Sequence, residues 1–253
     1  MIHFLIPLRS AQTTSDWPKI QHLLNLTLAS VFNQTSAEFK VMIACHEKPD
    51  ISSEFASRVS VFQVDYPAPV TSEEQMIDKY YKKRLMMKEM QQYQGGYVMF
   101  TDADDLISNR LAAFVHQEAN NNNDGWYFEN GYEFHYDKNL AKKAPKFYRV
   151  CGTSYIIHFK PSELPQTWEF NGYKRENRYL FDHGHNEWLT KFQEAGKILK
   201  PLPFRGAMYV INTGENYMAG STGFKRHILR WLTPGKTPDN QLKAEFKIPE
   251  IPQ

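Results

Sequence analysis

The chain has 253 residues, of which 42% are hydrophobic and 23% charged, and these proportions exclude a disordered, collagen-like or coiled-coil protein. A formal net charge of +2 gives no electrostatic reason to expect a nucleic-acid partner. The N-terminus lacks the features of a signal peptide and no apolar run approaches the roughly 20 residues of a membrane span, so we expect a cytoplasmic location.

The first hundred residues alternate between strand and helix patterns, which favours a doubly wound α/β sheet. Asp16 is a suitable helix cap because Trp17 and Pro18 follow it, and apolar residues then recur at helical spacing up to Phe32. The expected elements of this half are helices over residues 17–32 and 72–93 and strands over residues 3–8, 39–45, 59–64 and 97–101.

The pattern changes after Asp105, where aromatic and polar residues alternate and suggest antiparallel strands. The expected elements of this half are helices over residues 106–119 and 187–195 and strands over residues 126–136, 154–159, 198–202 and 208–211. We predict a single mixed α/β domain over residues 1–235. The tail over residues 236–253 contains several prolines and little apolar periodicity, so we expect an extended arm.

Three aspartates, Asp102, Asp104 and Asp105, directly follow the apolar strand at residues 97–101. Ligand sites in open α/β sheets lie outside the carboxyl ends of the strands, where these carboxylates are placed. Alternate residues of an extended segment project to the same side, so Asp102 and Asp104 are expected to face one pocket. Carboxylates suit Mn²⁺ or Mg²⁺, which also take phosphate oxygens as ligands.

Residues 97–105 (YVMFTDADD) resemble the DxD segment of the GT-A glycosyltransferases, in particular the family-2-like bacterial enzymes. The opening strand and loop at residues 4–9 and the basic stretch at residues 78–84 are also similar to that family. The resemblance covers residues 2–115 and implies a Rossmann-like mixed sheet flanked by helices. It divides the domain into a nucleotide-sugar-binding half, residues 1–115, and an antiparallel acceptor half, residues 116–235.

The resemblance also implies an activity. The expected enzyme is a metal-dependent glycosyltransferase that moves a sugar from a nucleotide-diphosphate sugar to a glycan or lipid-linked acceptor in bacterial surface polysaccharide synthesis. In this interpretation Asp104 ligates the metal that bridges the diphosphate, Asp102 contacts the metal, the ribose or the donor sugar, and Asp105 supports the sugar contact. The other residues expected at the nucleotide sugar are Pro7, Arg9, Asp78, Lys83 and Arg84.

The richest polar cluster of the second half lies at residues 179–188, around Asp182, His183, His185 and Glu187. Inverting family-2-like enzymes often carry a Glu-Asp pair just before a helix, and Gly184 and His185 stand at those positions here. His185 is our first candidate for a general base toward the acceptor hydroxyl, because an imidazole titrates near neutral pH, and Asp182 or Glu187 is the alternative. His183 or His185 is otherwise a ligand that completes the metal site.

Two other functions stay open. A catalytically inactive sugar- or nucleotide-binding protein on the same scaffold would account for the missing Glu-Asp pair. A phosphotransferase with a DxD nucleophile is the other, although such enzymes usually carry that motif on the first strand.

Three further segments allow more than one role. Residues 149–154 either line a sugar pocket or form an ordinary turn, and residues 212–221 are glycine-rich and suit a loop over the ligand. Residues 224–232 are basic and apolar at helical spacing, which suits either a peripheral contact with the inner membrane face or a packing helix. The many aromatic residues after Asp105 are expected to offer stacking faces to sugar rings.

Overall fold

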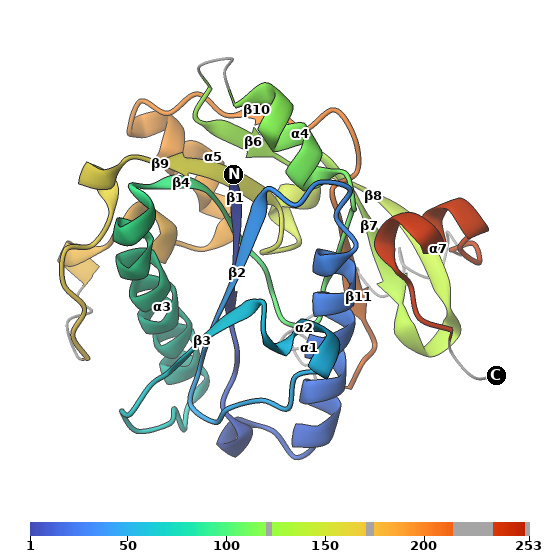
Figure 1. Ribbon diagram of the computed structural model, residues 1–253, viewed down its shortest axis with the longest axis horizontal. Coiled ribbons are helices and arrows are strands. Elements are labelled where there is room, and N and C mark those ends of the chain that lie inside the picture. Colours follow the sequence, from blue (N-terminus) through green and yellow to red (C-terminus); the bar gives the residue numbers. More distant parts are fainter. Residues whose placement is uncertain (120–122, 171–174, 215–234, 251–253) are drawn as a thin grey trace.

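The computed structural model describes residues 1–119, 123–170, 175–214 and 235–250. Figure 1 shows a central sheet with helices on both of its faces and a smaller sheet beside it. This is the mixed α/β class that the alternation of strand and helix patterns predicts, and that prediction is confirmed. Within the described residues, no helix combines the length and the hydropathy needed to cross a lipid bilayer.

The central sheet has seven strands in the order β10-β6-β9-β4-β1-β2-β3. In chain order they are β1 (Ile2–Pro7), β2 (Phe39–Cys45), β3 (Val59–Gln63), β4 (Gly96–Phe100), β6 (Gly125–Tyr127), β9 (Tyr155–Phe159) and β10 (Lys200–Pro201). The strands β4, β1, β2 and β3 run parallel, whereas β9 is antiparallel to both β4 and β6. Every residue of β1 is buried, as expected for a central strand that is covered on both faces.

The helices are α1 (Trp17–Phe32), α2 (Ser53–Ala56), α3 (Ser72–Glu89), α4 (Leu111–Glu118), α5 (His185–Glu194) and α7 (Asn240–Phe246). The side chain of Asp16 accepts a hydrogen bond from the Lys19 N–H at 3.0 Å, so it caps α1 as predicted. Thr71 and Glu74 form a reciprocal capping box at the start of α3, which fixes where that helix begins.

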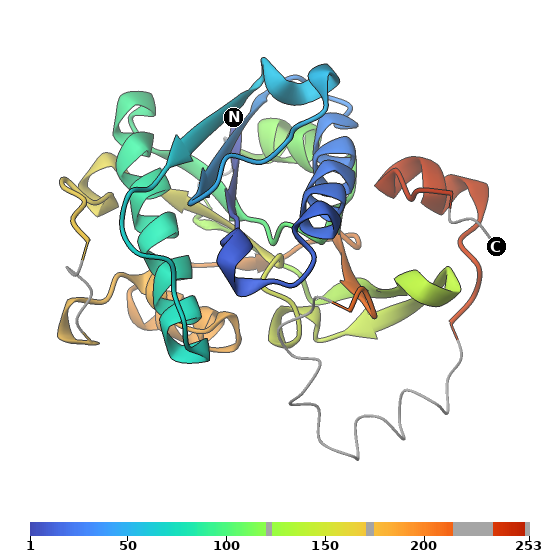
Figure 2. The same ribbon diagram turned by 90° about the horizontal axis from the view of Figure 1, so that it is seen from below.

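Two hydrophobic cores lie on opposite faces of the central sheet. Leu24 and Leu28 of α1 and Leu111 of α4 belong to the core on one face. Met86 of α3 and Trp188 of α5 belong to the core on the other face. Figure 1 shows the strands between α3 and α1, and Figure 2 shows the same arrangement from below. The result is a three-layer structure in which α3 and α5 share a face of the sheet.

A second sheet has four strands in the order β5-β11-β7-β8. Its strands are β5 (Leu106–Ile107), β7 (Asn130–His135), β8 (Leu140–Pro145) and β11 (Ala207–Ile211). β7 and β8 form an antiparallel hairpin and β5 is antiparallel to β11, but β11 runs parallel to β7. The second half is therefore largely, and not entirely, antiparallel.

Short 3-10 segments connect several of these elements. They are η1 (Ala11–Thr13), η2 (Met90–Tyr93), η3 (Tyr136–Lys138), η4 (Phe147–Arg149), η5 (Pro161–Glu163), η6 (Arg175–Asn177) and η7 (Leu180–Asp182).

Two local predictions are wrong. The helix expected over residues 106–119 is a two-residue strand followed by α4, because Leu106 and Ile107 pair with Met208 and Ala207 of β11. The tail expected to be extended contains α7, whose Phe246 is fully buried against the second sheet. The division into domains stays a prediction, and residues 224–232 lie outside the described residues.

Candidate functional site

The site forms where the sheet changes its direction of winding. The chain passes from β1 to β2 and β3 on one side, and then crosses through α3 to β4 on the other side of β1. A crevice between the carboxyl ends of two such strands is the usual ligand position in an open α/β sheet. Arg9 follows β1 and Asp102 follows β4, so both lie at this position between the two strand ends, which we call the crevice. Figure 2, seen from below, looks toward the end at which β1 stops.

The acidic loop places its three carboxylates differently. Asp102 and Asp104 are partly exposed, whereas Asp105 is fully buried. Burial and the nearby charge of Asp102 raise the pKa of Asp104 to about 7. Burial also raises the pKa of Asp105 well above its ordinary value, and the charges of its two neighbours add to that effect. Asp102 and Asp104 are therefore the two carboxylates of this loop that solvent reaches.

Lys79 and Arg9 supply positive charge to this loop. The Lys79 ammonium lies 2.5 Å from Asp102 Oδ1, and both side chains remain about one third exposed, at 38% and 31%. Burial is the largest single effect on Asp102 and opposes its ionisation. The charge and the hydrogen bond of Lys79, together with the charges of Lys83 and His185, outweigh burial and lower the pKa of Asp102. Arg9 lies near enough to Asp104 for its charge to favour the ionised form of that carboxyl. The crevice thus presents carboxylates and cations side by side.

The turn at residues 151–153 packs against the acidic loop. The Thr153 hydroxyl accepts a hydrogen bond from the Asp102 N–H at 2.9 Å and donates one to Asp105 Oδ2 at 2.5 Å. Cys151 Sγ lies 3.2 Å from the same Asp105 oxygen, and the Val210 N–H of β11 donates to Asp105 Oδ1 at 3.2 Å. Asp105 is thus an internal cross-link and does not line the crevice. The segment around residue 152 thus supports the acidic loop, and its role in lining a sugar pocket stays a prediction.

Lys83 occupies an aromatic slot beside the acidic loop. Its ammonium lies 4.7 Å from the ring centre of Phe100 and 4.6 Å from that of Trp188. Burial, with the nearby charge of Lys79, lowers the pKa of Lys83 to about 7. The charges of Asp102 and Asp182 oppose that shift. Among the described residues, the Lys83 ammonium has no hydrogen-bond partner.

Arg84 and Asp182 bind each other. The Arg84 Nε and Nη2 atoms donate to Asp182 Oδ2 at 2.8 Å and 2.6 Å, and the two side chains are 9% and 0% exposed. Burial raises the pKa of Asp182, against the opposing effect of Arg84. Arg84, predicted at the nucleotide sugar, and Asp182, predicted as a base, are therefore joined inside the protein.

His185 lies near the acidic loop, whereas His183 lies beside Glu187. His185 is the first residue of α5, and its ring is close enough to Asp102 for each charge to shift the other group's pKa. Burial lowers the pKa of His185, and a hydrogen bond to the backbone of Arg149 partly opposes that effect. His183 precedes α5, and its Nδ1 instead lies 3.5 Å from Oε2 of Glu187 in the first turn of that helix.

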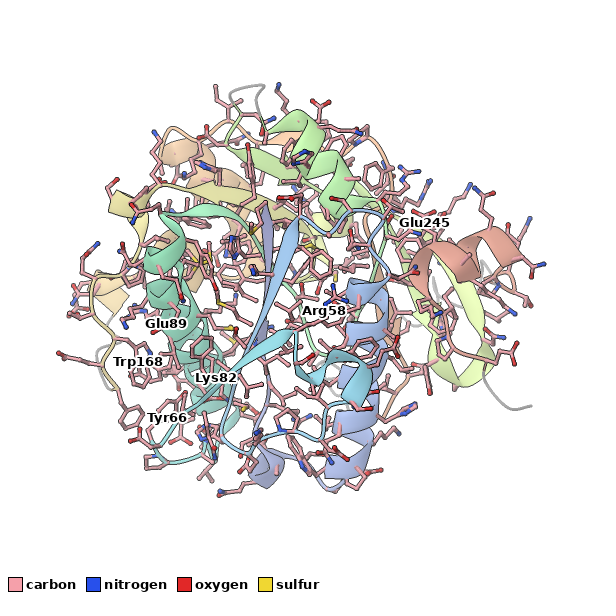
Figure 3. The ribbon with its side chains drawn as sticks, in the orientation of Figure 1. Arg58, Tyr66, Lys82, Glu89, Trp168 and Glu245 are labelled. Carbon is pink, nitrogen blue, oxygen red and sulfur yellow. The ribbon has the colours of Figure 1, made fainter. Side chains whose placement is uncertain are left out.

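Asp78 lies in a second buried network at the same edge of the sheet. Its carboxylate accepts hydrogen bonds from Lys82 at 2.6 Å and from the Tyr66 hydroxyl at 2.7 Å, and His46 Nε2 lies 2.9 Å from it. Lys82 also donates to the Leu8 carbonyl at 2.7 Å. Figure 3 labels Tyr66 and Lys82 near the lower end of α3. Asp78 thus joins the ends of β1 and β2 to α3.

Pro7 is the last residue of β1 and is buried, so it belongs to the packed end of that strand. The pattern of the sequence missed Lys79, Thr153 and Gly152 as individual site residues. Lys79 belongs to a charged helix whose residues look alike in sequence, and the partner of Thr153 lies 51 positions away. No local signal separates such residues from a solvated helix face or an ordinary turn.

The carboxylates of this site suit a divalent cation that is also bound by a substrate phosphate better than a cation that is bound by protein ligands alone. Among the described residues, no group of three or more His, Cys, Asp and Glu side chains is arranged to hold a metal ion. His183 is therefore not brought to Asp102 and Asp104 as a third ligand. Mg²⁺ and Mn²⁺ usually take one or two carboxylates and complete their shell with water and substrate phosphates. The two partly exposed carboxylates, Asp102 and Asp104, are of the kind that such a cation takes.

No protein-family model matches the sequence, and no curated protein matches it. Among solved structures the chain is similar to S. aureus TarS, at 15% identity and a TM-score of 0.48, over 83% of this chain and 36% of that one. It therefore spans little more than a third of the TarS chain.

Two further similar structures are matched over most of their length. A Bacillus anthracis protein described as a glucose-1-phosphate thymidylyltransferase, in complex with sucrose, shares 11% identity over 81% of this chain and 88% of that one, at a TM-score of 0.42. A Desulfovibrio desulfuricans protein described as a nucleotide-diphospho-sugar transferase shares 9% identity over 91% and 95%, at a TM-score of 0.38. Function is therefore argued below from the residues of the site.

Proposed function

We propose that this protein is a glycosyltransferase of the GT-A type that uses a nucleotide-diphosphate sugar and a divalent cation, Mn²⁺ or Mg²⁺. The observation that carries the proposal is the position of Asp102 and Asp104, which face the crevice between the carboxyl ends of β1 and β4. A pair of exposed carboxylates among Arg9, Lys79 and Lys83 suits a diphosphate that arrives with its cation.

The donor site consists of residues from the first half. Asp104, with Asp102, would hold the cation, which when bound neutralises charge on the leaving diphosphate. Arg9 adds positive charge to the same crevice, where departure of a nucleoside diphosphate builds up negative charge. Lys83, whose pKa is lowered to about 7, can take up a proton there as that negative charge develops. The buried network around Asp78 keeps the ends of β1 and β2 in place beneath the nucleotide.

His185 is the residue we propose as general base. It starts α5 beside Asp102, and burial lowers its pKa, so the imidazole is neutral and able to accept a proton at neutral pH. Asp182, the second candidate, is fully buried and bonded to Arg84. The proton of the acceptor hydroxyl would pass to the free ring nitrogen of His185 as that hydroxyl attacks the sugar.

The acceptor side carries aromatic surface as well as aromatic core. Trp188 and Phe134 are buried and belong to the packing of the fold. Phe170 is 39% exposed and stacks on Tyr66 at 4.5 Å, beside the network around Asp78. A glycan or a lipid-linked acceptor, as in surface polysaccharide synthesis, is the substrate class we propose.

Thermal unfolding in the presence of candidate ligands tests this function. UDP, GDP, CMP and their sugars are added with and without Mn²⁺, and a nucleoside diphosphate should stabilise the protein only when the metal is present. Donor hydrolysis is then measured for the ligand that binds. Binding without hydrolysis or transfer would assign a binding protein, and no response to any of these nucleotides would reject the proposal.

A further inference from the structure

Arg84 and Asp182 tie the two halves of the chain together beneath the proposed site. They are 98 positions apart, yet two nitrogens of the Arg84 guanidinium donate to a single Asp182 oxygen. The same oxygen accepts the Tyr179 N–H at 3.0 Å, and Arg84 Nη2 donates to the Asn177 carbonyl at 2.9 Å. The segment from residue 177 to residue 182 is thus folded around the guanidinium.

That segment leads directly into α5, whose first residue is His185. Trp188 Nε1 donates to the His183 carbonyl at 2.8 Å, so the turn before α5 is also held by the helix itself. Lys83, the neighbour of Arg84 on α3, lies against the Trp188 ring. The Tyr155 hydroxyl of β9 donates to the His185 carbonyl at 3.0 Å. The start of α5 is thereby attached to α3 and to the central sheet.

We propose that Arg84 and Asp182 are positioning residues whose ion pair holds His185 in place at the start of α5, near the acidic loop. This inference rests on the proposed function, in which His185 accepts the proton of the acceptor. Asp182 is fully buried and Arg84 nearly so, which separates both from a substrate in the crevice. They act through the backbone between Asp182 and His185, because a catalytic group must be held close to its productive position.

A buried ion pair makes a specific prediction about single and double variants. Removing one partner leaves the other charge buried without compensation, whereas removing both leaves none. Each single variant should therefore displace the start of α5 more than the double variant does. If Asp182 were instead an independent general base, a second substitution elsewhere could not offset the activity lost with its carboxylate.

The experiment uses Asp182→Asn, Arg84→Gln and the double variant of the full chain, with the donor identified by the thermal screen. We expect each single variant to lower kcat by about 10- to 100-fold, as a displacement of roughly 1 Å does. The donor dissociation constant should stay within about twofold, because Asp102 and Asp104 are unchanged. The double variant should be no slower than the slower single variant. Arg84→Met, which also removes the charge and keeps a long side chain, replaces Arg84→Gln if the latter fails to fold.

The ion pair of Lys197 and Glu163 provides a matched control. Its atoms lie 2.7 Å apart, Lys197 is buried, and it follows the other end of α5. Lys197→Gln removes a buried partner just beyond the C-terminal end of α5 without touching the segment before His185. We expect it to lower the melting temperature while kcat stays unchanged. If Lys197→Gln lowers kcat as much as Asp182→Asn does, the loss of activity comes from general destabilisation and the inference is overturned.

Other outcomes are equally decisive. If Asp182→Asn abolishes turnover while Arg84→Gln keeps it, Asp182 is a catalytic group and the inference fails. Full activity in either single variant also overturns it. If no nucleotide binds the wild type, the proposed function fails, and hydrogen exchange of residues 183–188 then decides the positioning claim. Faster exchange there in Asp182→Asn but not in Lys197→Gln supports the claim, and equal exchange refutes it.

Discussion

The hydroxyl of Thr153 accepts a hydrogen bond from the backbone N–H of Asp102 at 2.9 Å. It also donates to the buried carboxyl group of Asp105 at 2.5 Å, so one side chain fixes both ends of the acidic loop. The geometry of the carboxylates that face the crevice therefore depends on a residue that lies outside that loop and carries no charge.

Thr153→Val tests this dependence at nearly constant volume. The variant removes a donor and an acceptor from buried partners, which should lower the free energy of unfolding by about 1–3 kcal/mol. It should also weaken metal-dependent nucleotide binding, because the Asp102 backbone loses its support. Thr153→Ser retains the hydroxyl and serves as the control. Urea unfolding and calorimetric binding measure the two effects, and equal behaviour of the valine and serine variants would contradict the role of the hydroxyl.

Gly152→Ala probes the space around Asp102. A Cβ atom at residue 152 would lie 2.9 Å from Asp102 Oδ2, closer than such atoms normally approach. The neighbour is the end of a side chain and not backbone, so the fold should persist while the carboxylate moves away. We expect a melting temperature close to that of the wild type and weaker Mn²⁺-dependent nucleotide binding. Unchanged binding would show that the position of Asp102 is not critical.

Lys79 competes with a cation for Asp102. The ammonium already lies against Asp102 Oδ1, and a metal ion bound to that oxygen must displace it. Lys79→Gln should therefore strengthen Mn²⁺ binding about two- to fivefold, a small effect because exposed ion pairs are weak. Electron paramagnetic resonance of free Mn²⁺ measures the dissociation constant. Lys191→Gln, which breaks the exposed pair with Glu194, is the control and should leave it unchanged. Weaker Mn²⁺ binding in Lys79→Gln would contradict the competition.

Lys83 should make stability depend on pH. Burial lowers its pKa to about 7 in the folded protein, whereas an unfolded lysine titrates near 10.4. Its contribution to stability is present above the unfolded pKa and is lost as the pH falls through about 7, because the unfolded chain binds the proton more tightly. The free energy of unfolding of the wild type should thus fall relative to Lys83→Met between pH 9.5 and pH 7, by at most about 1.4 kcal/mol per pH unit.

Lys88→Met is the control for this comparison, since Lys88 lies on the same helix and is 41% exposed. Its free energy of unfolding should follow that of the wild type across the same pH range. Parallel curves for the wild type and Lys83→Met would show that Lys83 keeps an ordinary pKa in the folded protein.

The sequence predicts the elements whose signals are local. The apolar run of β2 and the capped, periodic helix α1 appear where the pattern places them, because strand burial and helix capping depend on neighbouring residues. The paired strands β5 and β11 are different, since Leu106 and Met208 meet only in the folded chain. α7 was missed because Leu242 and Phe246 give too short an apolar pattern among prolines.

The residues of the candidate site also divide into those with a local sequence signal and those whose partners lie far away in the chain. Asp102 and Asp104 could be placed at the end of a strand from sequence alone, because the strand that precedes them is continuous and apolar. The burial of the charged residues of α3 could not be predicted from sequence, because a run of lysines and arginines is typical of a solvated helix face. Arg84 is buried because Asp182 neutralises it from a distant part of the chain, and no spacing reveals that partner.

Calorimetric titration with UDP and GDP, with and without Mn²⁺, tests the central claim most directly when wild type and Asp104→Asn are compared. Asp50→Asn, an exposed aspartate outside the acidic loop, is the matched control. We predict metal-dependent binding of one nucleoside diphosphate to the wild type and to the control, and none to Asp104→Asn. Binding that needs no metal and survives in Asp104→Asn, or no binding to the wild type, would contradict the assignment of this crevice as a nucleotide-sugar site.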